Sequence, residues 1–209
     1  MRFAVYLRGR SFYHTDYYHT DFSESCDNIN EMILDPLRKD GHTVDIFCCT
    51  YISHKLEFVL NFYKPIKTLV VNDDDLASVN SWNRQKIFSL EGVRLLKAHE
   101  SANNIQYDYC INLRFDILFK VPITKQAIDL TKFNIMFKHT SGNCDDNYWI
   151  FPRKYFDLFE ESLIKLLKKE STITHEINHY LGDFTIHYMY ETDSNEYRYY
   201  SFTRTTNYK

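Results

Sequence analysis

Two kinds of hydrophobic pattern alternate along the chain. Short runs of consecutive apolar residues, typical of strands buried on both faces, are separated by longer stretches in which apolar residues recur every three or four positions, as on one side of a helix. Strands that alternate with helices form a mostly parallel sheet covered on both faces, so we expect an α/β fold around a sheet of about six strands. The runs predict strands at residues 3–7, 44–49, 68–71, 109–113, 134–137 and 148–151.

The stretches between these runs carry helix signals. Gly41 stands at a typical helix stop after the first helical stretch, and Pro65 follows the second. No repeat, low-complexity linker or domain boundary interrupts the pattern, so residues 1–209 are expected to form a single domain. The spacing predicts helices over residues 29–37, 56–63, 82–102 and 155–169, and a further helix that begins near residue 174.

Composition and charge narrow the classes of function. The chain is 44% hydrophobic with a formal net charge of −3, which argues against a dedicated nucleic-acid binder. No apolar run approaches the roughly 20 residues of a membrane span, and the first residues are interrupted by charge too soon for a secretory signal. Five cysteines without Cys-x-x-Cys spacing favour a reducing compartment, so we expect a cytoplasmic location, in the host if the protein is viral. The five glycines form neither a dinucleotide fingerprint nor a P-loop.

Charged and polar residues follow four of the predicted strands. In open α/β sheets the ligand binds outside the carboxyl ends of the strands, so these residues are expected to line one site. The competing explanation for these polar residues is that strands end in loops, and loops are usually polar. The residues at the four strand ends are Arg8, Gly9 and Arg10; Thr50 and Tyr51; Asn72 to Asp75; and Arg114 to Asp116.

The carboxylate of Asp116 lies between two stretches of buried-strand sequence. A buried charge without a partner is unfavourable, so this group needs one. A divalent ion bridged to a diphosphate is one candidate, because hard cations prefer carboxylate and phosphate oxygens. Arg114, two positions earlier and on the same side of the strand, is the other candidate. The run Asp73-Asp74-Asp75 also spells Asp-x-Asp, so Asp73 and Asp75 are alternative metal ligands, although such a run is also typical of a solvated turn.

Several segments together resemble the GT-A glycosyltransferases. The context Tyr-Asp-Tyr-x-Ile-x-x-Arg-x-Asp-x-x-Phe over residues 107–119 is similar to the Arg-x-Asp variant of the Asp-x-Asp motif in that family. Residues 44–50, 63–65 and 145–155 match further family segments in the expected order, so the resemblance covers roughly residues 2 to 190. The small size and strand order also resemble those of chlorella-virus glycosyltransferases that decorate capsid protein.

The resemblance implies a function and a site. It implies transfer of a hexose-type sugar from a UDP-sugar to a hydroxyl of a glycan or glycoprotein, with Mn²⁺ or Mg²⁺ on Asp116 stabilising the departing diphosphate. It places Asp146 and Asp145 at the sugar or acceptor, as a general base or as groups that orient the sugar. A non-catalytic nucleotide-sugar-binding module would share the same features. The resemblance assigns nucleotide contacts to Arg8, Gly9, Arg10, Thr50, Asp73 and Arg114.

A rival motif lies near the C-terminal end. His175-Glu176-Ile177-Asn178-His179 is a literal H-E-x-x-H, which on a helix binds zinc through both histidines and uses the glutamate as general base in metallopeptidases. The third ligand would have to come from Glu191 or Glu196. A zinc metallopeptidase is therefore the alternative reading, against which stands the α/β alternation of the preceding chain.

Overall fold

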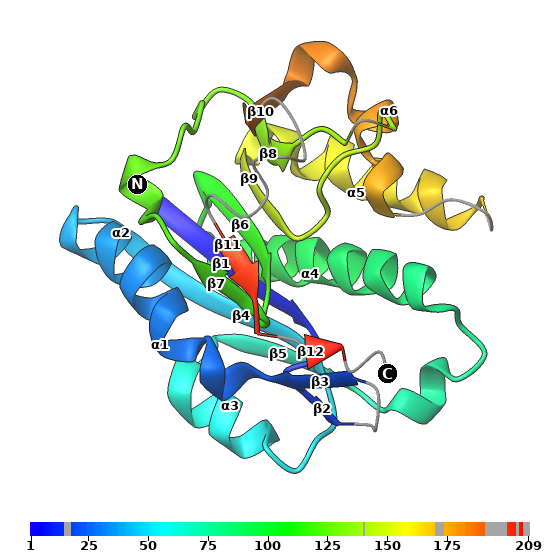
Figure 1. Cartoon of the computed structure of the whole chain (residues 1–209). Coiled ribbons are helices and arrows are strands. Elements are labelled where there is room, and N and C mark those ends of the chain that lie inside the picture. Colours follow the sequence, from blue (N-terminus) through cyan, green and yellow to red (C-terminus); the bar gives the residue numbers. More distant parts are fainter. Residues whose placement is uncertain (15–17, 140, 170–173, 191–199, 204, 207–209) are drawn as a thin grey trace.

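A mixed seven-stranded sheet runs through the molecule in the order β10-β8-β9-β6-β1-β4-β5 (Figure 1). The computed structural model describes residues 1–14, 18–139, 141–169, 174–190, 200–203 and 205–206. The strands of this sheet are β1 (Arg2–Gly9), β4 (Thr43–Tyr51), β5 (Lys67–Val71), β6 (Tyr109–Arg114), β8 (Phe133–Phe137), β9 (Tyr148–Pro152) and β10 (Ile186–Tyr190).

Most strand pairs of the sheet are parallel. β1 pairs in parallel with β4 and β6, β4 with β5, and β10 with β8, whereas β9 is antiparallel to both of its neighbours. The carboxyl ends of β1, β4, β5 and β6 therefore meet at one edge. The predicted α/β class with a mostly parallel sheet is confirmed.

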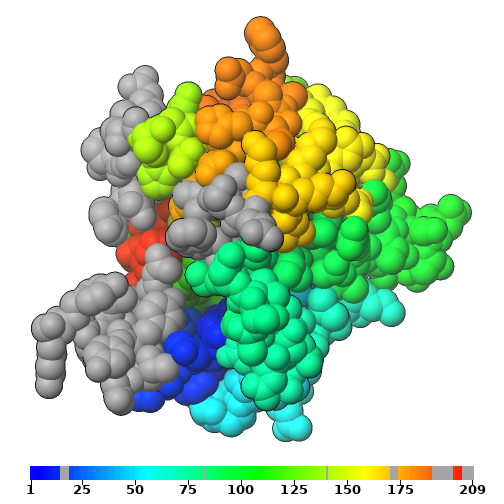
Figure 2. All heavy atoms as spheres, turned by 90° about the vertical axis from the view of Figure 1, so that its right-hand side faces the viewer, coloured from blue at the N-terminus to red at the C-terminus, as the bar shows by residue number. Residues whose placement is uncertain are grey.

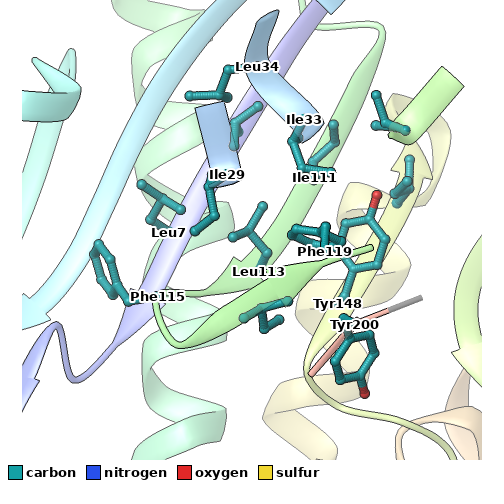
Figure 3. Packing of buried hydrophobic residues seen from close by; sticks show 14 of the residues in the cluster. Leu7, Ile29, Ile33, Leu34, Ile111, Leu113, Phe115, Phe119, Tyr148 and Tyr200 are labelled. Carbon is teal, nitrogen blue, oxygen red and sulfur yellow. The ribbon is translucent and has the colours of Figure 1, made fainter. Parts of the chain in front are cut away.

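Helices cover both faces of the sheet, as Figure 1 shows. The helices on one face are α1 (Cys26–Ile29), a π-turn (Asn30–Leu34), α2 (Asp35–Lys39) and α3 (Leu56–Tyr63), and those on the other face are α4 (Ser81–Asn103), α5 (Phe156–Leu167) and α6 (Asn178–Leu181). The first group packs against Val5 and Leu7 of β1, and the second group packs against Ala4 and Tyr6, because successive side chains of a strand point to opposite faces. Figure 3 shows the core on the side of the first group, in which Ile29 and Ile33 lie against Ile111 and Leu113 of β6.

Two small antiparallel sheets lie beside the large one. β7 (Ile117–Phe119) pairs with β11 (Tyr200–Phe202), and β3 (Tyr18–Asp21) pairs with both β2 (Phe12–His14) and β12 (Thr205–Thr206). The last strands of the described chain are thus attached to segments near its beginning and middle. These strands are short, and β11 and β12 pair with segments distant in the sequence, so the local pattern did not predict their pairing.

In the described part of the chain, no helix has both the length and the apolar character needed to cross a bilayer. The helix expected near residue 174 is a 3₁₀ turn (Thr174–Glu176) followed by the four-residue α6.

Candidate functional site

A pocket of about 390 Å³ opens at the carboxyl ends of β1, β4 and β6. This volume lies within the range of small-molecule sites. Six of the residues that the sequence assigned to the strand ends line it together: Arg8, Gly9, Arg10, Tyr51, Arg114 and Asp116. The other lining residues are Tyr13, Thr20, Val79, Ser81, Arg84, Gln85 and Phe88.

Arg8 and Arg114 stand side by side at the floor of this pocket. They are opposite each other in the parallel pairing of β1 with β6. Arg8 is 2% exposed; its Nε donates to Asn112 Oδ1 at 2.6 Å, and its guanidinium lies 5.4 Å from the ring centre of Trp149. Burial lowers the pKa of Arg8, the charge of Asp146 opposes this effect, and the charge of Arg114 adds to it. Two cations are therefore held close together in a place with little water.

Arg114 forms a two-pronged ion pair with Asp116. Its Nε donates to Oδ1 at 2.8 Å and its Nη2 to Oδ2 at 2.7 Å. Asp116 is 2% exposed, and both oxygens of its carboxylate accept hydrogen bonds from one guanidinium. Such paired N–H···O bonds are among the stronger polar contacts in proteins. The sequence left Arg114 and a metal ion open as partners, and the structure provides Arg114.

The surroundings of Asp116 do not fit a divalent metal ion. A cation at this carboxylate would have to displace the guanidinium of Arg114 and approach Arg8, whose charge repels it. Among the residues that the structure describes, no group of three or more His, Cys, Asp or Glu side chains is placed to hold a metal. The Mn²⁺ or Mg²⁺ site that the resemblance implies at Asp116 therefore has no matching donor set in this arrangement.

Arg10 and Arg84 form the opposite wall and share the carboxylate of Asp73. Arg10 Nη1 lies 2.7 Å from Oδ2, and Arg84 Nη1 lies 2.6 Å from Oδ1. The Arg10 guanidinium also stacks between two rings, 4.0 Å from the centre of Tyr13 and 4.6 Å from that of Tyr51. Figure 2 shows the N-terminal segment, in blue, beside the segment that leads into α4, and the pair between Arg10 and Asp73 joins these two segments.

The turn after β1 aims Arg10 into the pocket. Gly9 has φ of +98°, in the left-handed region that a residue with a Cβ adopts only under strain. The chain therefore changes direction immediately after Arg8, and Arg8 and Arg10 reach different walls of the pocket.

Two of the predicted nucleotide contacts lie behind the pocket lining. Thr50 is buried and its hydroxyl donates to Ser11 Oγ at 3.0 Å, while the next residue, Tyr51, lines the pocket. Asp73 supports the two arginines from behind, and Asp75 is exposed in the 3₁₀ turn that follows β5.

Asp146 lies next to the pocket and contacts its floor through the backbone. Its carbonyl oxygen accepts a hydrogen bond from Arg8, and its carboxylate oxygen Oδ1 lies 3.6 Å from Nε2 of His175. The side chain is 4% exposed. Its position is compatible with the predicted place at the sugar end of a donor.

Asp145 is fully buried rather than exposed to the pocket. Its Oδ1 accepts from Asn147 Nδ2 at 2.5 Å and from the Tyr200 hydroxyl at 2.8 Å, whereas Oδ2 has no hydrogen-bond partner among the described residues. Burial, with a second contribution from the charge of Asp146, raises the pKa of Asp145 to about 6. Asp145 therefore faces the protein interior and binds β11 through the hydroxyl of Tyr200.

Asp145→Asn is expected to change how stability depends on pH. The folded pKa of about 6 exceeds the ordinary value of 3.8, so the stability that the protonated carboxyl contributes is fully present below about pH 4 and is lost as the pH rises through about 6. A shift of this size corresponds to about 3 kcal/mol. We compare the free energy of unfolding of Asp145→Asn with that of wild type, by urea unfolding, at pH 4 and at pH 7.5. The difference between the two proteins should shift in favour of the variant by up to about 3 kcal/mol from pH 4 to pH 7.5. An equal difference at both pH values would contradict the raised pKa.

The H-E-x-x-H residues do not converge. His175 and Glu176 lie in a 3₁₀ turn, and His179 lies in the separate helix α6. His175 Nδ1 is 2.7 Å from the carbonyl oxygen of Cys144, whereas His179 Nε2 is 3.4 Å from Oδ1 of Asn143. The two imidazoles thus face different groups. Glu191 and Glu196, considered as third ligands, lie outside the described residues.

Sequence reasoning missed two prominent lining residues, namely Tyr13 and Arg84. Arg84 lies in the first turn of α4 and Tyr13 in β2, and neither position shows from the sequence that it faces the ends of β1 and β6.

Comparison with known proteins establishes the fold class. No protein-family model matches the chain, and no curated protein matches its sequence. The crystal structure of galactosyltransferase LgtC in complex with donor and acceptor sugar analogues is 12% identical, with a TM-score of 0.50 over 89% of this chain and 72% of that one. The chain therefore has the GT-A-like fold that the sequence predicts.

Two further solved structures are similar to a comparable extent. A crystal structure of an active-site mutant of LgtC is 13% identical with a TM-score of 0.49, over 89% of this chain and 72% of that chain. A glycosyltransferase involved in glycosylation of the major capsid of PBCV-1 is 10% identical with a TM-score of 0.48, over 89% of this chain and 82% of that chain.

Proposed function

We propose that this chain is a single-domain glycosyltransferase that transfers a hexose-type sugar from a UDP-sugar to a hydroxyl of a glycan or glycoprotein. The observation that carries this proposal is the pocket at the carboxyl ends of β1, β4 and β6, whose described lining residues include four arginines and one carboxylate. A diphosphate fits this charge, and the site lies where ligands bind in open α/β sheets. LgtC, which has this fold, was crystallised with donor and acceptor sugar analogues.

The reaction requires stabilisation of the negative charge that develops on the leaving diphosphate. The acceptor oxygen forms a bond to the anomeric carbon, the bond from that carbon to the diphosphate breaks, and its electron pair leaves with the diphosphate. Guanidinium groups already fixed around the diphosphate stabilise this developing charge without having to reorganise. Arg8 and Arg114 at the floor, with Arg10 and Arg84 at the wall, are placed for this role.

The proton of the acceptor hydroxyl needs an acceptor of its own. Asp146 is the carboxylate that we propose for the sugar end, because it adjoins Arg8 at the pocket floor. In an inverting transfer it would take the proton, and in a retaining transfer it would orient the sugar. Asp145 supports this segment from the interior through Tyr200 and Asn147.

The five cysteines are buried free thiols, which supports the reducing cytoplasm proposed for the protein.

The proposal is tested by calorimetric titration with UDP, GDP and CMP, followed by turnover of the corresponding nucleotide sugars. We expect UDP to bind, and Arg10→Gln to weaken its binding by about tenfold or more because a charge-assisted contact to phosphate is lost. The control is Arg38→Gln, since Arg38 forms an exposed pair with Asp35 on α2 and should leave binding unchanged.

Two outcomes would change the proposal. Failure of every nucleotide to bind would contradict it. Binding without release of UDP from UDP-sugars, with water or with a panel of glycan acceptors, would instead support a non-catalytic nucleotide-sugar-binding module.

A further inference from the structure

The charge of the pocket is unusual for a site expected to hold a metal ion. Among the lining residues that the structure describes are four arginines and one carboxylate, which gives these residues three net positive charges. Asp73, behind Arg10 and Arg84, offsets one more. A divalent cation entering this field is repelled, whereas a diphosphate is attracted.

The carboxylate of Asp116, which is the one carboxylate among the described lining residues, already has a function in the structure. Asp116 receives both hydrogen bonds of the Arg114 fork, at 2.8 and 2.7 Å, and these contacts fix the guanidinium next to Arg8. Arg8 and Arg114 lie opposite each other on neighbouring strands, so an anion bound between them would offset the repulsion of their charges. Burial lowers the pKa of Arg8, the charge of Asp146 opposes this effect, and the charge of Arg114 adds to it. The two oxygens of Asp116 thus orient the Arg114 guanidinium and are not open to a metal ion.

The opposite wall is prepared for the same ligand. Arg10 is held by Asp73 and by the rings of Tyr13 and Tyr51, and Arg84 is held by Asp73 and by the carbonyl oxygens of residues 76 and 79. A planar guanidinium fork can donate to two oxygens of one phosphate, and a fork that is already held in place loses little conformational entropy when it binds.

From these observations we infer that Arg8, Arg10, Arg84 and Arg114 bind the diphosphate of the donor without a divalent metal ion, and that Asp116 positions Arg114. This inference rests on the proposed function, since it concerns the same nucleotide site. In the transfer reaction the arginines would supply the charge stabilisation that a metal ion supplies elsewhere, and the electron pair of the broken bond would stay on the diphosphate that they hold.

The test is calorimetric titration of the whole chain with UDP, GDP and ADP, in EDTA and again with Mn²⁺. For the nucleotide that binds, we expect the dissociation constants in EDTA and in Mn²⁺ to agree within about threefold, a difference of less than 1 kcal/mol. Binding that weakens more than about tenfold in EDTA would overturn the inference while leaving the proposed function intact. Absence of binding under both conditions would overturn the proposed function and the inference with it.

Variants separate the two roles of Asp116 in a second way. If Asp116 held a metal, Asp116→Asn would weaken binding in Mn²⁺ and leave binding in EDTA unchanged. As the partner that fixes the Arg114 guanidinium, Asp116 acts without a metal, so Asp116→Asn should change the dissociation constant by the same factor in EDTA and in Mn²⁺. Arg84→Gln should weaken binding in EDTA by about tenfold or more, and Arg38→Gln should not change it. Thermal unfolding shows whether each variant is folded. A folded Asp116→Asn protein that binds the nucleotide like wild type in EDTA but more weakly than wild type in Mn²⁺ would overturn the inference.

Discussion

Gly92→Ala is expected to lower the free energy of unfolding by about 3 kcal/mol, the upper part of the usual range for overpacking a core. A Cβ on Gly92 in α4 would lie 2.0 Å from Cε1 of the Tyr6 ring, far inside contact distance. Tyr6 is fully buried in the central strand β1, and its hydroxyl donates to the carbonyl oxygen of Phe88. The ring therefore has no free space into which it can move, and the helix itself would have to shift away from the sheet.

Two intrinsic effects oppose each other at this position. Replacing glycine by alanine inside a helix ordinarily stabilises it by about 1 kcal/mol, and the clash must exceed that gain. Urea unfolding of Gly92→Ala measures the sum. Ser101→Ala, at an exposed position of the same helix, is the matched control and should lie within about 0.5 kcal/mol of wild type. A stabilised Gly92→Ala protein would show that α4 is free to move on the sheet.

Arg114→Met should also be strongly destabilising, by about 3 kcal/mol. The substitution keeps much of the apolar stem but leaves the carboxylate of Asp116, 3% exposed as a side chain, without the guanidinium that accounts for both of its 2.7–2.8 Å contacts. The removal of one partner from a buried pair costs the desolvation of the other. Addition of Asp116→Asn should restore most of the lost stability, because an amide is less unfavourable than a charge in that place.

A matched substitution at the protein surface isolates the effect of burial. Arg38→Met breaks the pair of Arg38 with Asp35, whose side chains are 46% and 44% exposed, and should change the free energy of unfolding by less than about 1 kcal/mol. Chemical unfolding of the four proteins gives the comparison. Equal effects of Arg114→Met and Arg38→Met would contradict the view that the Arg114–Asp116 pair is buried and fixed.

The sequence predicted the large sheet well because its strands are nearly continuous apolar runs. The helix expected over residues 82–102 is α4 at Ser81–Asn103, and the strand expected at 109–113 is β6 at Tyr109–Arg114. Short edge strands such as β2, β7 and β11 form because of partners distant in the sequence, so a local pattern does not predict their pairing.

The site was predictable to the extent that it follows from sheet topology. The rule that parallel strands present their carboxyl ends at one edge predicted that Arg8, Arg10 and Arg114 would converge. It could not predict that Arg84 enters from the start of α4, because the packing angle of that helix depends on contacts such as Gly92 against Tyr6. Nor could it predict the burial of Asp145, which depends on Tyr200, 55 residues away in sequence.

The attachment of β11 has a thermodynamic consequence for the pocket. Tyr200 donates to Asp145 in the interior, and the backbone N–H of Thr203 donates to the carbonyl oxygen of Asp116 in the pocket lining at 3.0 Å. A segment from a late part of the chain is thus bonded both to the pocket lining and to the interior behind it. Two-stranded sheets such as β7 with β11 have little stability of their own. Detachment of β11 should therefore be the easiest local opening near the pocket. If the ligand binds the attached form more tightly, reciprocity requires that occupancy of the pocket slows hydrogen exchange at Thr203, and the C-terminal strand then reports whether the donor site is filled.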